Sequence, residues 1–180
     1  MKPTQNDIKI LFNGKPEEFI NQYKQEFDNF VSEEEFLEFN NLDDSEKMES
    51  LFEFLFTIPV SREDDDDEVV YALAEEFLPY EVDAEYAKNG LSITIDKQSH
   101  FVPLKSTPED RYTVIRKLDS LIKPKFETRV MKVSLDYDYD NDDMHSIIIL
   151  EKSEWDTMES EYGKEKISEY FEKIDNVNFE

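Results

Sequence analysis

Residues 80–96 read YEVDAEYAKNGLSITID, and this stretch decides the fold class. Apolar and polar side chains alternate on both sides of Lys88-Asn89-Gly90, which is typical of a half-buried β-hairpin with a tight turn. The residues before it have the period of a helix instead. The sequence therefore predicts an α+β protein, in which a helical N-terminal part is followed by antiparallel strands.

Four helices are expected before the hairpin. Apolar side chains recur in them every three or four residues, Pro16 stands at a first helical position, and Pro59 and Pro79 follow two helix ends. Their aromatic stripes are interpreted as core and not as the lining of a cofactor site. The predicted helices cover residues 16–31, 32–39, 44–58 and 66–78.

From the hairpin onward, the sequence predicts the order β-β-β-α-β-β-α, with an antiparallel sheet covered by helices. Thr107 and Pro108 start the middle helix, and Gly163 interrupts the last one. Ser146–Leu150 is too apolar to be anything but a buried strand. We expect one domain over residues 1–180, with an acidic helical part at 1–79 and an antiparallel α+β part at 80–180. The further strands and helices are expected at residues 100–104, 107–122, 126–138, 144–152 and 153–174.

The balance of charge is strongly acidic. The chain has 45 acidic and 20 basic residues, a net charge of −25, and residues 1–80 contain 22 acidic and 6 basic residues. This opposes binding to nucleic acid or to anionic membranes, because both attract cations. It favours a cationic partner, although solubility alone is an alternative explanation of the charge.

Features of catalytic and metal sites are scarce. The chain has no Cys, only 3 Gly and 2 His, and it lacks the nucleophile-elbow, zinc-protease and phosphate-loop motifs. No apolar run is long enough to cross a membrane, and the N-terminus has no signal-peptide core. We therefore expect a cytoplasmic protein that is not an enzyme and that binds no cofactor and no metal.

Two acidic stretches are candidate sites for a basic partner. The stretch 135–150, LDYDYDNDDMHSIIIL, resembles a calcium loop, but registers that start at Asp136 or Asp140 lack the required Gly at position 6. The stretch 62–70, REDDDDEVV, would also stabilise a helix N-terminus, and both stretches could be solvated loops. If the strand continues through DYDYD, its aspartates share one face and its tyrosines the other. The candidate partner-binding residues are Asp64, Asp65, Asp66, Asp67, Asp136, Tyr137, Asp138, Tyr139, Asp140, Asp142 and Asp143.

Trp155 is the only tryptophan and falls in the first turn of the last predicted helix. We expect it to pack in the core. The alternative is an anchor in an interface, because Trp is common at binding hot spots.

Residues 90–172 resemble a known kind of bacterial protein. The segment begins with a hairpin and a strand that contains VPL (102–104). A helix then opens with PEDR (108–111) and ends in LIKPKFETR (121–129). A strand that ends in IIILEKSEW (147–155) precedes a helix with EYG (161–163). This layout resembles the compact α+β immunity proteins found beside polymorphic bacterial toxins, including contact-dependent growth inhibition systems. The resemblance implies a non-enzymatic cytoplasmic protein that binds and neutralises a cognate toxin. The other hypothesis is an acidic adaptor, regulatory or nucleic-acid-mimicking protein that binds another cationic protein.

Overall fold

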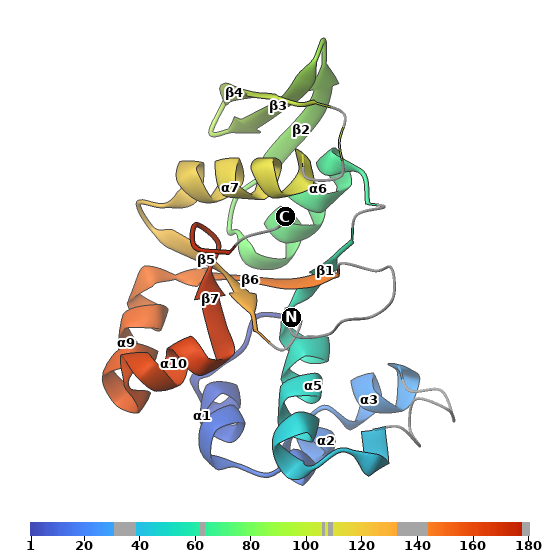
Figure 1. Ribbon diagram of the computed structural model, residues 1–180, viewed down its shortest axis with the longest axis vertical. Helices are drawn as coiled ribbons and strands as arrows, with labels where there is room; N and C mark the ends of the chain where they lie inside the picture. Colours follow the sequence, from blue (N-terminus) through green and yellow to red (C-terminus); the bar gives the residue numbers. More distant parts are fainter. Residues whose placement is uncertain (31–38, 62–63, 106, 108–109, 133–143, 178–180) are drawn as a thin grey trace. The chain divides into compact units, whose positions relative to one another are not determined.

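The computed structural model describes residues 1–30, 39–61, 64–105, 107, 110–132 and 144–177 (Figure 1). The chain divides into two compact units, residues 1–57 and 58–180. The described part of the first unit is helical, and the second contains helices and antiparallel sheets. The predicted α+β class with a helical N-terminal part is confirmed.

The first unit contains helices where the aromatic stripes predict them, with one difference. The helix expected over residues 16–31 is two helices, because Tyr23 leaves the helical conformation at φ −117° and ψ 37°. Most of the helix expected at 32–39 lies outside the described residues. A helix that the sequence did not predict precedes these. The described helices are α1 (Gln5–Asn13), α2 (Pro16–Gln22), α3 (Lys24–Phe30) and α5 (Asp44–Phe56).

Asp7 links the end of α2 to the start of α1. Its buried carboxylate accepts hydrogen bonds from Thr4 N at 2.7 Å and Thr4 Oγ1 at 2.6 Å, and so caps α1. Its other oxygen accepts from Gln22 Nε2 and from the Tyr23 hydroxyl, both at 2.8 Å. A buried carboxylate is tolerated only when such donors surround it. The end of α2 is therefore held against the start of α1.

Aromatic rings fill the core of the first unit. The ring of Phe19 lies 6.3 Å from Phe52 and 5.9 Å from Phe56, and Tyr23 meets Phe56 edge-on at 5.4 Å. Edge-on and tilted pairs are the arrangements that aromatic quadrupoles favour. The stripes are core, as expected.

The second unit contains two antiparallel sheets. The larger has the strand order β1-β6-β5-β7, and the smaller is the meander β2-β3-β4. Two of the strands, β1 and β7, have three residues each and were not predicted. The strands are β1 (Ile58–Val60), β2 (Val82–Ala87), β3 (Gly90–Ile95), β4 (Gln98–Pro103), β5 (Phe126–Met131), β6 (His145–Glu151) and β7 (Phe171–Lys173).

The hairpin at residues 80–96 forms as predicted. Ala87 pairs with Gly90 across the turn, and Asn89 has φ +65°. A Cβ atom at Gly90 would lie 2.2 Å from the carbonyl oxygen of Val102. Only glycine fits there, because the neighbouring strand passes too close for any side chain.

Four helices accompany the sheets in the described part of the second unit. In Figure 1, α6 and α7 lie between the two sheets, and both contact strands of each. Phe126 of β5 meets Tyr80, whereas Arg129 meets Trp155 of α9, so α9 covers the opposite face of the larger sheet. Gly163, at φ +90°, separates α9 from α10 as expected. The helices are α6 (Asp66–Phe77), α7 (Asp110–Ile122), α9 (Lys152–Tyr162) and α10 (Lys164–Tyr170).

The predicted core of this unit is confirmed at β6 and at Trp155. Every residue of Ser146–Leu150 is buried, since helices cover both faces of the strand. Trp155 is 1% exposed, and its indole N–H donates to the carbonyl oxygen of Glu127 at 3.0 Å.

A paired charge network lies beside Trp155. The guanidinium of Arg129 is 4.1 Å from the Trp155 ring centre, and its Nη2 contacts Glu127 at 2.7 Å and Glu159 at 2.8 Å. Burial raises the pKa of Glu127, but hydrogen bonds from Lys173 and Arg129 outweigh burial and hold it below its usual value. The network joins β5, β7 and α9, so we interpret it as structural.

Candidate functional site

The four consecutive aspartates begin helix α6. Asp64 accepts a hydrogen bond from Ser61 N at 2.7 Å and so belongs to the turn before the helix. Asp65 is the N-cap residue, and Asp66 and Asp67 lie in the first turn, where the positive end of the helix dipole favours carboxylates. Among the described residues, no ion pair joins any of the four to a basic residue. Asp65 is exposed, and Asp64, Asp66 and Asp67 are half-buried.

These aspartates are continuous with a wider acidic surface. Asp67, Tyr71 and Glu75 are spaced four residues apart along one stripe of α6, in which Asp67 is half-buried and Tyr71 and Glu75 are exposed. Glu81 and Asp83 follow at the start of the adjacent strand β2 (Figure 1). The α6–β2 acidic surface consists of Asp65, Asp66, Asp67, Tyr71, Glu75, Glu81, Asp83 and Tyr86.

The charge of this surface is one-sided. Residues 64–87 contain ten acidic residues and no Lys or Arg. The ten are Asp64, Asp65, Asp66, Asp67, Glu68, Glu75, Glu76, Glu81, Asp83 and Glu85.

Two tyrosine hydroxyls fix α6 to β2. The Tyr71 hydroxyl accepts from Ala84 N at 3.1 Å and lies 2.8 Å from both the Ala84 carbonyl oxygen and Asp83 Oδ1, to one of which it donates. The Tyr86 hydroxyl accepts from Asp66 N at 3.1 Å. The two rings remain 39% and 56% exposed. The surface is therefore built on a regular helix and strand, and it presents aromatic as well as acidic side chains.

The pKa of Asp66 reflects the charged side chains around it. Burial raises the pKa of Asp66 above its usual value, and Asp110 at the start of α7 raises it further. Arg111, 6% exposed, acts in the opposite direction. Its Nε and Nη1 atoms have no hydrogen-bond partner among the described residues.

The tyrosines also respond to this charge. Burial raises the pKa of Tyr86, and Asp66 and Asp67 raise it too, against the lowering effect of the Asp66 N–H. The hydrogen bond from Ala84 lowers the pKa of Tyr71, but the bond to Asp83 and the nearby carboxylates raise it overall. Both hydroxyls are therefore protonated at neutral pH.

The second predicted acidic stretch has its candidate residues in the segment 133–143, which lies outside the described residues. They are Asp136, Tyr137, Asp138, Tyr139, Asp140, Asp142 and Asp143.

Other kinds of site were sought in the described part of the chain. It has no group of three or more His, Asp and Glu side chains arranged to hold a metal ion. Within the same residues, no helix combines the length and the apolar character needed to cross a membrane. His145 Nδ1 lies 2.6 Å from the hydroxyl of the buried Tyr112, so β6 and α7 are joined there.

The fold and the site together define an antiparallel α+β protein with an acidic, tyrosine-bearing surface on a helix–strand pair. Comparison with protein-family models, with curated proteins and with solved structures gives no match.

Sequence reasoning missed the tyrosines and the later carboxylates of this surface. Tyr71, Tyr86 and Glu81 are scattered along the chain, and only the packing of α6 against β2 brings them beside Asp65–Asp67. The sequence does contain a signal for this surface. Residues 64–87 include no Lys or Arg, and Tyr71 and Glu75 follow Asp67 at intervals of four residues, as on one side of a helix.

Proposed function

We propose that this protein binds a basic partner protein through the α6–β2 acidic surface. The observation that carries the proposal is the gathering of six carboxylates and two exposed tyrosines on one helix–strand pair, in a segment without a base. Carboxylates attract a cationic partner over a distance, and tyrosines supply contact area with little loss of conformational entropy.

The rigid support of the surface favours binding. The two tyrosine hydroxyls hold α6 against β2, so few bonds need to be frozen when a partner arrives. Preorganised surfaces bind more tightly because less ordering free energy opposes association. Complementary charge acts chiefly on the association rate, and buried aromatic contacts act on dissociation.

The partner that we propose is the toxic effector of a toxin–immunity pair. The support is the resemblance of residues 90–172 to immunity proteins, together with an acidic surface in the same unit of the chain. In this role the protein occupies a basic cleft of the toxin and performs no chemistry of its own.

Co-expression with the toxic product of a neighbouring gene tests the immunity role. We expect the wild-type protein to restore growth and to form a complex whose association slows as salt is added. If cells that express both proteins still die, the immunity role is refuted.

A charge variant tests the surface. In Asp65→Asn/Asp67→Asn, each Asn keeps the size and polarity of the Asp that it replaces, and association at low salt should slow roughly tenfold. The matched control is Asp156→Asn/Glu165→Gln, which removes the same charge from exposed positions of α9 and α10. Equal association rates for the two variants would place the interface elsewhere.

A further inference from the structure

A pocket opens at the C-terminal end of α6, within the acidic surface. Its volume is about 360 Å³, near the lower end of the roughly 300–1,000 Å³ found for small-molecule sites. It is formed by one continuous segment that runs from α6 through Pro79 into β2. The lining residues are Tyr71, Ala74, Glu75, Leu78, Pro79, Tyr80, Glu81 and Val82.

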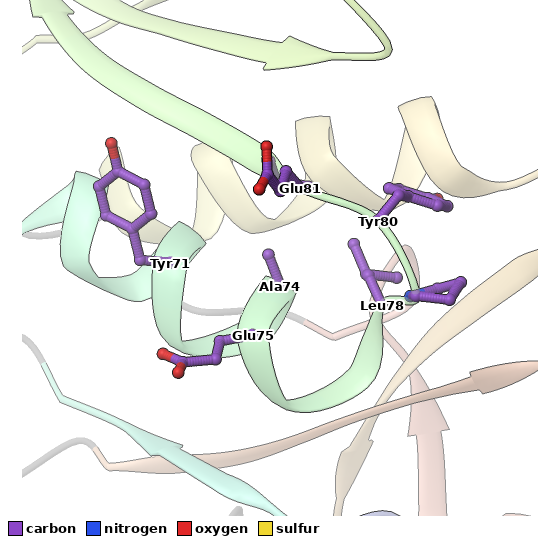
Figure 2. Close-up of a pocket in the computed structure, with 8 residues that line it drawn as sticks. Tyr71, Ala74, Glu75, Leu78, Tyr80 and Glu81 are labelled. Carbon is purple, nitrogen blue, oxygen red and sulfur yellow. The ribbon is translucent and has the colours of Figure 1, made fainter.

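The pocket has an apolar floor between two aromatic rings. Figure 2 shows Ala74 and Leu78 between Tyr71 at one end and Tyr80 at the other. Tyr71 is held by its bonds to Ala84, and Tyr80 meets the ring of Phe126 edge-on at 6.1 Å. The walls are therefore fixed before any ligand arrives.

The charge around the pocket is negative. Glu75 and Glu81 are exposed, and neither forms a hydrogen bond or an ion pair with the described part of the chain. The last turn of α6 adds the negative end of a helix dipole, and that turn contains no basic residue. An anion would be repelled here, and a neutral apolar group would leave both carboxylates without a counter-charge.

We propose that this pocket receives one arginine side chain of the basic partner. Its aliphatic stem lies on Leu78 and Val82, and its guanidinium meets Glu81 and a tyrosine ring. Arginine suits the pocket better than lysine, because its planar group stacks on aromatic faces and binds carboxylates with paired hydrogen bonds. The inference rests on the proposed function and identifies the group that the surface recognises.

Small probes test the pocket without the partner. In spectra of the ¹⁵N-labelled full chain, N-acetyl-arginine N-methylamide should shift the amide signals of residues 71–82 with a millimolar dissociation constant. The lysine analogue should bind several-fold more weakly, and the uncharged norleucine analogue should cause no shifts. Equal shifts with norleucine, or arginine shifts spread evenly over other acidic segments, would overturn the inference.

Variants separate the pocket from the wider surface. Glu75→Gln/Glu81→Gln should weaken binding of the arginine probe about tenfold. The control Asp156→Asn/Glu165→Gln also removes two negative charges, but from positions outside the pocket, and should keep wild-type affinity. Unchanged binding by the first variant would refute the pocket. If the probe binds as expected and no basic partner is found, the proposed function fails while the pocket stands.

Discussion

Tyr71 shows how a single hydroxyl supports both the fold and the surface. Strand β2 is at the edge of its sheet, so its outward amide and carbonyl groups need other partners. The Tyr71 hydroxyl accepts from the outward amide of Ala84 and lies 2.8 Å from its carbonyl oxygen, and the ring forms one wall of the pocket. One side chain thus blocks the strand edge and shapes the candidate site.

Tyr71→Phe should leave the ring in place and expose the Ala84 amide. We expect hydrogen exchange at Ala84 to accelerate and the free energy of unfolding to fall, since the Ala84 amide loses its hydrogen-bond acceptor. Tyr86→Phe is the control, because it should leave Ala84 protected. Unchanged exchange at Ala84 in Tyr71→Phe would show that the hydroxyl does not close the edge.

At the scale of elements, the contact between α7 and β5 depends on a buried acid. Asp119 of α7 is 2% exposed and accepts a hydrogen bond from Thr128 N at 2.8 Å. Burial raises its pKa above the usual value, against the lowering effects of Thr128 and Lys123. Because the folded state favours the protonated form, the contribution of Asp119 to stability is greatest below its unfolded pKa and is lost as the pH rises through the folded pKa.

Two variants separate the charge of Asp119 from its hydrogen bond. Asp119→Asn keeps an acceptor for Thr128 N and should match or exceed wild-type stability at pH 7, and this advantage should shrink as the pH falls toward 4. Asp119→Ala leaves the buried amide unpaired and should lower the free energy of unfolding by about 1–3 kcal/mol at both pH values. Urea denaturation at the two pH values measures both effects. A wild type that gains no stability relative to Asp119→Asn on acidification would contradict the raised pKa.

At the scale of the whole molecule, like charge accumulates in both units. Residues 1–57 hold 14 acidic and 5 basic residues, a net of −9, and residues 58–180 hold 31 and 15, a net of −16. Such self-repulsion opposes compact folding and is screened by salt. The same charge keeps the protein in solution and attracts cations.

Raising sodium chloride from about 10 to about 150 mM should therefore increase the melting temperature, because the Debye length falls from roughly 30 to 8 Å over this range. Calorimetry at fixed pH measures the change. Below about 0.2 M salt, a decrease would indicate that attractive ion pairs at the surface, such as Lys123–Asp175, outweigh the repulsion.

The fold was predictable where the local pattern is strong. The alternation around Asn89-Gly90 predicts the hairpin, the run Ser146–Leu150 predicts a buried strand, and Gly163 predicts the break between the last helices. The three-residue strands β1 and β7 were not predictable, since so few residues carry no period and form strands only by pairing with β6 and β5. The hydrogen bond from Tyr23 to Asp7 was not predictable either, since it joins residues sixteen apart.

The candidate site was likewise predictable only where it depends on local sequence. The sequence by itself determined the net charge, the acidic start of α6 and the class of fold, because these depend on composition and short-range periodicity. Only the tertiary structure decided which carboxylates and tyrosines share a surface and where a pocket forms. The physical reason is that α6 packs between two sheets, and this packing selects the one stripe of its side chains that remains exposed beside β2.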